Sequence, residues 1–144
     1  MNKKILLLNP PFLNKYSKSS RSPAVTKSAT IYFPLWLSYA AGVLDKEGYT
    51  LKLIDAPARC ITKEDCLEEI RAFNPDMVVV DTSTASINSD LAYSKVLKDT
   101  LPAVKIVLVG THVSATVKEI LPEYKDYVDF IARHEYDYTI PEIA

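Results

Sequence analysis

Glycine is scarce in this chain. Only Gly42, Gly48 and Gly110 occur among 144 residues. Their spacing cannot form the G-x-G-x-x-G turn of dinucleotide-binding folds, nor the G-x-x-x-x-G-K loop that cradles phosphates. Both of these nucleotide-binding classes are therefore excluded.

Cysteine and histidine are equally scarce, with two of each. Cys60 and Cys66 form no Cys-x-x-Cys pair, and His112 and His134 lie far along the chain from them, which argues against a structural zinc site. Two cysteines also cannot supply the ligands of an iron–sulfur cluster. We therefore expect reduced thiols and no metal held by side chains of this domain.

The chain also lacks a charge of one sign and a long apolar run. Lys and Arg number 17 against 18 Asp and Glu, so no broad basic surface attracts a nucleic acid. No apolar run approaches the ~20 residues of a membrane span. The amino-terminal run, Ile5–Leu8, is shorter than the roughly 7–15 residues of a secretory signal. These absences predict a cytoplasmic protein with neither a nucleic-acid nor a membrane partner.

Three short β-branched or leucine-rich runs are present, and each ends abruptly in small polar residues or prolines. The runs are 5–8, 78–80 and 106–109, followed by 9–11, 81–86 and 110–114. Buried strands that end in such loops build the ligand crevice of an open parallel α/β sheet, at the carboxyl ends of its strands. The sequence thus predicts where a ligand binds before it indicates which ligand.

Helical and strand patterns alternate along the chain. Strands are predicted at 4–8, 50–54, 76–80, 104–109 and 127–132, and helices near 34–47, 62–73, 88–101, 113–121 and 138–144. In the third helix, Leu91, Ala92 and Val96 are expected to face inward, and Trp36 and Tyr39 in the first are expected in the core. The alternation predicts a flavodoxin-like, Rossmann-type, doubly wound five-stranded parallel sheet of order 2-1-3-4-5.

The chain length fits one domain, residues 1–144. The last helical pattern has barely begun at Tyr138 when the sequence stops. We interpret the domain as the N-terminal fragment of a longer protein.

The loop residues resemble those of a known family, the N-terminal cobalamin-binding domain of cobalamin-dependent radical S-adenosylmethionine enzymes. The similarity covers nearly the whole chain, and the order and spacing of the pieces carry it. The matching pieces are 5–11 (ILLLNPP), 33–44 (FPLWLSYAAGVL), 55–56, 82–84 (TST), 109–115 (VGTHVSA) and 132–136 (ARHEY).

This resemblance implies that a corrin lies over the carboxyl ends of the strands, with its nucleotide tail running down beside the sheet. The cofactor-binding residues that follow from it and from the strand-end loops are Asn9, Pro10, Pro11, Thr82, Ser83, Thr84, Ser86, Gly110, Thr111, His112, His134 and Glu135. His134 stands where the family usually has the glycine of a Gly-Glu pair.

The loop after the first strand lacks a histidine. Methionine-synthase-like domains carry Asp-x-His-x-x-Gly there, whereas this chain has Asn9–Asn14. The resemblance therefore implies base-off cobalamin without a histidine ligand to cobalt. It also implies that S-adenosylmethionine and a [4Fe-4S] cluster belong to a following radical S-adenosylmethionine domain, with a methyltransferase as the favoured full-length enzyme. No catalytic residue, and no catalysis by this domain alone, is expected.

Two other functions fit the same fold. Asp81 ends the third strand, where receiver domains carry the aspartate that accepts a phosphoryl group, although Asn9 replaces the acidic pair that would hold Mg²⁺. Alternatively, the domain has lost its ligand and acts as an interaction platform, a reading that His134 keeps open.

Overall fold

The computed structural model describes residues 3–19 and 25–144, and its centre is a five-stranded parallel sheet. The strands are β1 (Lys4–Asn9), β2 (Thr50–Asp55), β3 (Met77–Asp81), β4 (Lys105–Val109) and β5 (Phe130–Ile131). Their order is β2-β1-β3-β4-β5, and every pair is parallel. The predicted fold class and strand order are confirmed.

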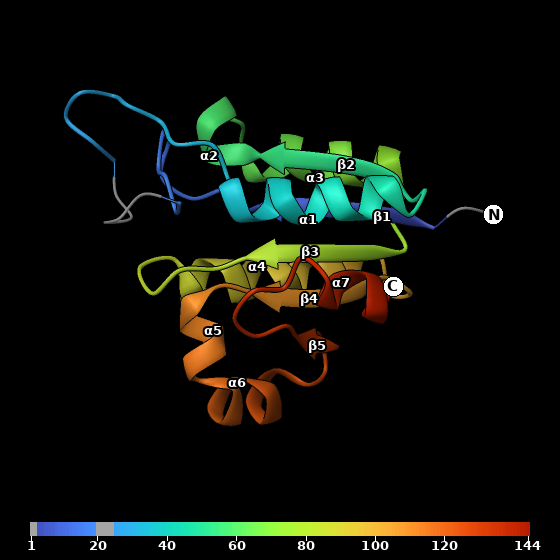
Figure 1. Cartoon of the computed structure of the whole chain (residues 1–144). Helices are drawn as coiled ribbons and strands as arrows, with labels where there is room; N and C mark the ends of the chain where they lie inside the picture. Colours follow the sequence, from blue (N-terminus) through green and yellow to red (C-terminus); the bar gives the residue numbers. More distant parts are fainter. Residues whose placement is uncertain (1–2, 20–24) are drawn as a thin grey trace.

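Helices cover both faces of the sheet (Figure 1). They are α1 (Leu35–Lys46), α2 (Ala56–Arg59), α3 (Lys63–Phe73), α4 (Ile87–Thr100), α5 (Thr111–Ala115), α6 (Val117–Tyr124) and α7 (Thr139–Ile143). Helices α1 and α7 pack on one face, and α3, α4 and α6 contribute to the core on the other.

Alternating side chains of each strand supply the two cores. In β1, Ile5 and Leu7 face α1 and α7, whereas Leu6 and Leu8 face the opposite core. All four are fully buried. Such continuous burial explains why the central strands β1, β3 and β4 are uninterrupted apolar runs, whereas the edge strand β2 alternates. By the same alternation, Asn9 and Asp81 at the ends of β1 and β3 belong to the α1 face.

Three predictions about the elements were wrong. Strand β5 has two residues instead of six, and the helix expected at 113–121 is two helices, α5 and α6, with Pro122 inside α6 rather than at its end. Pro122 is the sixth residue of α6 and lies close to its end, so the N–H that a proline cannot donate removes one hydrogen bond from the last turn.

The third error concerns which side of α4 is buried. Ala92 and Val96 are exposed, and the inward positions are Asp90, Leu91, Tyr93, Ser94 and Leu97. Two polar residues therefore occupy the buried stripe, so the apolar pattern alone indicated the wrong phase.

The long connection after β1 folds back onto the sheet. The Lys15 amide donates to the Pro57 carbonyl at 2.8 Å, and Tyr16 and Ser17 are buried. Residues 20–24 of this connection, like residues 1–2, lie outside the described residues. Among the residues that the structure describes, no helix is long and apolar enough to span a membrane.

Candidate functional site

A cavity of about 1210 Å³ opens at the carboxyl ends of the strands. Its wall draws on the connection after β1, on α1, on the loops after β3 and β4, and on the segment after β5. The lining residues are Lys18, Ser19, Trp36, Tyr39, Asp81, Thr82, Ser83, Thr84, Ala85, Gly110, Thr111, Ser114, Ala115, Arg133, His134, Glu135, Tyr136 and Asp137. This is the edge at which parallel α/β sheets bind ligands.

Glycine at position 110 lets the loops after β3 and β4 approach each other closely. Gly110 has φ +121°, and a Cβ there would lie 2.3 Å from the Thr82 carbonyl oxygen. The Thr82 hydroxyl donates to the Val109 carbonyl at 2.7 Å, and the Thr82 amide donates to the same oxygen at 2.9 Å. Because Thr82 occupies the space beside Gly110, the missing side chain serves loop packing at this point.

A buried polar network holds the loop after β3. The Ser83 and Ser86 hydroxyls lie 2.7 Å apart, and Ser86 donates to Asp90 Oδ2 at 2.7 Å. Lys18 Nζ donates to Asp90 Oδ1 at 3.0 Å and to the Asp81 carbonyl at 2.6 Å. The Lys18 and Asp90 side chains are 3% and 0% exposed, so this ion pair joins the long connection to α4 in the interior.

The segment after β5 is joined to the loop after β4 through Ser114. The Ser114 hydroxyl donates to the Gly110 carbonyl at 2.8 Å and accepts from the His134 amide at 3.1 Å. His134 has φ +58°, a left-handed conformation in which glycine is favoured. A glycine would adopt this backbone without strain, and His134 adopts it here with its side chain.

Burial and neighbouring charges raise the pKa of Asp81 to about 6. Desolvation is the main cause, Lys18 opposes it, and the carboxylates of Asp90 and Asp55 add to it. Burial likewise raises the pKa of Tyr136, with Asp81 and then Asp137 as the charged contributors. The Tyr136 hydroxyl is buried and has no hydrogen-bond partner in the described part of the chain.

The predicted site residues divide into two groups. The cavity is lined by Thr82, Ser83, Thr84, Gly110, Thr111, His134 and Glu135. The other five, Asn9, Pro10, Pro11, Ser86 and His112, do not line it. His112 lies beside it, because its Nδ1 is 3.2 Å from the Thr84 hydroxyl.

At the end of β1, Asn9 bonds within the protein. Asn9 Nδ2 donates to Asp55 Oδ1 at 2.8 Å, and both prolines are buried. The buried Asn9 Oδ1 has no hydrogen-bond partner among the residues described.

Sequence reasoning missed several lining residues. Trp36 and Tyr39 were expected in the core, but each is 55% exposed, and their rings lie 6.0 Å apart at the cavity rim. Helical spacing could have predicted their exposure. Leu37, Ala40 and Leu44 form the buried stripe of α1, and Trp36 and Tyr39 lie outside it. For Lys18 no local pattern distinguishes a buried cation from the other basic residues of the connection.

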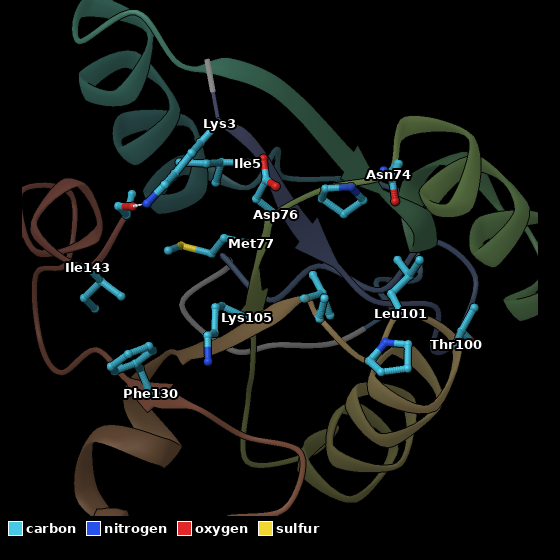
Figure 2. A pocket seen from close by; sticks show the side chains of 15 residues that line it. Lys3, Ile5, Asn74, Asp76, Met77, Thr100, Leu101, Lys105, Phe130 and Ile143 are labelled. Atoms are coloured by element: carbon cyan, nitrogen blue, oxygen red, sulfur yellow. Dashed lines mark hydrogen bonds between the residues drawn. The ribbon is translucent and has the colours of Figure 1, made fainter. Parts of the chain in front are cut away.

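A second, smaller cavity of about 520 Å³ lies around the amino ends of the strands (Figure 2). Its charged groups already bond within the protein. Lys105 pairs with Asp129 at 3.0 Å, Asp76 accepts from the Lys4 amide at 2.7 Å, and Lys3 donates to the Ala144 carbonyl. We therefore place the candidate site at the carboxyl edge.

Fold and cavity together define a parallel α/β domain with a cavity at the carboxyl ends of its strands. The B12 binding domain family matches residues 21–144, and the chain belongs to this family.

The chain is also similar in sequence to two curated proteins. The chain is 33% identical over 103 residues to the anaerobic magnesium-protoporphyrin IX monomethyl ester cyclase of Cereibacter sphaeroides, which covers 71% of the chain and 17% of that protein. It is 29% identical over 141 residues to an uncharacterized methyltransferase of Pyrococcus horikoshii, which covers 98% of the chain and 28% of that protein. The chain thus spans less than a third of the length of either relative.

Solved structures with the same fold include a response regulator from Thermotoga maritima and a CheY-like protein from Pseudomonas aeruginosa. The first has a TM-score of 0.63 at 12% identity and covers 99% of this chain and 95% of that one. The second has a TM-score of 0.61 at 11% identity and covers 99% and 100%. At such identities the likeness shows the shared fold alone.

Proposed function

We propose that this domain binds cobalamin at the carboxyl edge of its sheet and serves a radical S-adenosylmethionine enzyme as its N-terminal module. The single observation that carries the proposal is the 1210 Å³ cavity, which opens at the carboxyl ends of the strands in a chain that belongs to the B12 binding domain family. Its size exceeds the ~300–1,000 Å³ of most small-molecule sites and suits part of a large cofactor.

The residues at the cavity fit such a cofactor. Trp36 and Tyr39 present aromatic surface at the cavity rim. After β4 the cavity is lined by Gly110, Thr111 and Ala115, whose side chains are small. The buried hydroxyl of Tyr136, which has no hydrogen-bond partner among the residues that the structure describes, provides a polar group for a ligand. Bound cobalamin supplies a cobalt centre for methyl transfer or radical chemistry, and this chain's residues hold and orient it.

The proposed state is base-off, without a histidine ligand. The end of β1 offers Asn9, Pro10 and Pro11 in place of an imidazole, and Asn9 is held by Asp55. The single imidazole among the cavity-lining residues belongs to His134, whose backbone is fixed by Ser114. We expect a base-off absorption spectrum at neutral pH that His134→Ala leaves unchanged.

The full-length enzyme is proposed to be a methyltransferase. The name of the Pyrococcus relative supports this reaction class, and the greater length of both relatives supports a following domain that would carry the cluster and S-adenosylmethionine.

The test is direct binding of hydroxocobalamin. Wild-type protein is expected to retain the corrin absorption through gel filtration and to lose fluorescence from Trp36, the chain's one tryptophan. Ala115→Trp places a large ring in the cavity wall and should weaken binding at least about tenfold, whereas Ala92→Trp, exposed on α4, should bind as wild type. A wild-type protein that elutes without corrin would overturn the proposal and favour the ligand-free platform.

The receiver-like alternative has less support. Asp81 is suitably placed, but the described residues hold no group of three or more His, Cys, Asp or Glu able to bind a metal ion. Asn9 lies between Asp55 and Asp81 in the sheet order, where a further carboxylate would be needed. Incorporation of phosphate from acetyl phosphate with Mg²⁺ would favour this alternative.

A further inference from the structure

Several polar side chains of the cavity wall already bond within the protein. The Thr82 hydroxyl is engaged by Val109, the Ser83 hydroxyl by Ser86, and the Ser114 hydroxyl by Gly110 and the His134 amide. These groups shape the wall, but they have little capacity left to discriminate between ligands.

Two further polar groups of the wall are the half-buried Asp81 carboxylate and the buried Tyr136 hydroxyl, and the half-buried Asp137 also lines the cavity. Tyr136 is 5% exposed, and its hydroxyl has no partner within the described ranges 3–19 and 25–144. Lys18 is the charge that most favours ionised Asp81, but its hydrogen bonds go to the Asp81 carbonyl and to Asp90.

These two groups lie on the same side of the sheet. Asp81 follows Met77 and Val79 on the face that packs against α1 and α7, and Tyr136 belongs to the same core cluster. The Asp81 charge is also one of the causes that raise the pKa of Tyr136. The cavity therefore has a carboxylate acceptor and a phenolic donor near each other on one wall.

A ligand group that satisfies both must offer a donor beside an acceptor. The edge of adenine does so, with its exocyclic amino group next to a ring nitrogen, whereas dimethylbenzimidazole presents two methyl groups there. A buried polar group left without a partner costs free energy that a hydrogen-bonding ligand recovers.

We infer that this cavity selects cobamides whose lower base is a hydrogen-bonding purine such as adenine over those that carry dimethylbenzimidazole. The inference rests on the proposed function, because it assigns the lower base of the tail to the wall formed by Asp81 and Tyr136. Asp81 and Tyr136 would therefore determine which cobamide is preferred, and other residues of the cavity would hold the corrin.

The experiment compares the dissociation constants of two cobamides for the same protein near pH 7.5, one with adenine and one with dimethylbenzimidazole as the lower base. Absorbance changes of the corrin and quenching of Trp36 report binding. Wild type should bind the adenine form about tenfold tighter or more, the size expected from one or two recovered hydrogen bonds.

Two variants assign the preference to its residues. Tyr136→Phe and Asp81→Val should each reduce the ratio of the two constants toward one. Tyr138→Phe and Asp126→Val change exposed residues outside the cavity and should keep it. Circular dichroism checks that each variant is folded. If Asp81→Val is unfolded, the comparison of Tyr136→Phe with wild type still tests the inference.

The outcomes separate this inference from the proposed function. Failure to bind either cobamide overturns the proposed function. Equal binding of both, or tighter binding of the dimethylbenzimidazole form, overturns the inference while cobamide binding stands. A preference that survives in both Tyr136→Phe and Asp81→Val also overturns it.

Discussion

At Gly110 a single hydrogen atom in place of a methyl group decides whether two loops can meet. We expect Gly110→Ala to lower the free energy of unfolding by about 2–4 kcal/mol, because the new Cβ would collide with the Thr82 carbonyl at a φ that alanine rarely adopts. Urea denaturation measures the change.

Gly42→Ala is the matched control for this substitution. Gly42 lies inside α1 with no atom within 4 Å of an added Cβ. Alanine there should leave stability unchanged or raise it by up to about 1 kcal/mol. Equal losses in both variants would show that loop contact at Gly110 is not what matters.

The raised pKa of Asp81 makes stability depend on pH in a stated direction. The folded-state pKa is about 6 against an ordinary value of 3.8, so the folded state holds its proton to higher pH than the unfolded chain does. The stabilising contribution is complete below about pH 4 and is lost as the pH rises through about 6.

Asp81→Asn should therefore flatten the fall in the free energy of unfolding between pH 4 and 7, with a difference on the order of 1 kcal/mol or more. Urea titrations across that range measure it, and Asp126→Asn, an exposed site, should follow the wild-type profile. A variant profile parallel to wild type would show that Asp81 titrates normally.

At the residue scale, the sequence located the strand-end loops but not the partners of their side chains. Thr82 and Gly110 could be placed at the cavity because each directly follows a buried strand, whereas His134 was placed there by the family resemblance. The isolation of the Tyr136 hydroxyl and the burial of Lys18 depend on contacts between distant segments, which no local pattern reports.

Among the elements, the long connection after β1 is joined to α4 by a buried ion pair between Lys18 and Asp90. We expect Lys18→Met to lower the free energy of unfolding by about 3–5 kcal/mol, because Asp90 would remain charged and unpaired in the interior. Adding Asp90→Leu should restore much of the loss.

Lys95→Met provides the comparison for this ion pair. Lys95 pairs with Asp99 on the surface of α4, with both side chains more than half exposed, so the change should stay within about 0.5 kcal/mol. If Lys18→Met proves as mild, the buried pair does not anchor the connection.

Strand positions were more predictable than helix phase. Continuous apolar runs predicted β1, β3 and β4 to within one residue at each end, since burial on both faces leaves such a signal, and alternation predicted the edge strand β2 equally well. The phase of α4 was wrong because Asp90 and Ser94 lie in its buried stripe, where Asp90 accepts from Lys18 and Ser86.

For the molecule as a whole, a ligand at the carboxyl edge would join segments that lie far apart in the sequence. Lys18, Trp36, Thr82, Thr111 and Glu135 all line one cavity. Hydroxocobalamin should therefore raise the melting temperature, by an amount equivalent to about 2.7 kcal/mol at a free concentration one hundred times the dissociation constant. Differential scanning fluorimetry at several concentrations measures it, and no shift at saturation would contradict binding to the folded state.

Strand β5 has two residues, and its shortness affects how readily this part of the structure opens locally. In the described part of the chain the β4–β5 ladder has two residue pairs, extended by the bond from the Ala132 amide to the Leu108 carbonyl, so the wall that carries His134 and Tyr136 is joined to the sheet by the shortest ladder. Amide hydrogens at 130–132 should exchange with deuterium sooner than those of β1 and β3, because the segment can detach without global unfolding. A large ligand would then enter and leave by local opening at β5, while the rest of the sheet stays folded.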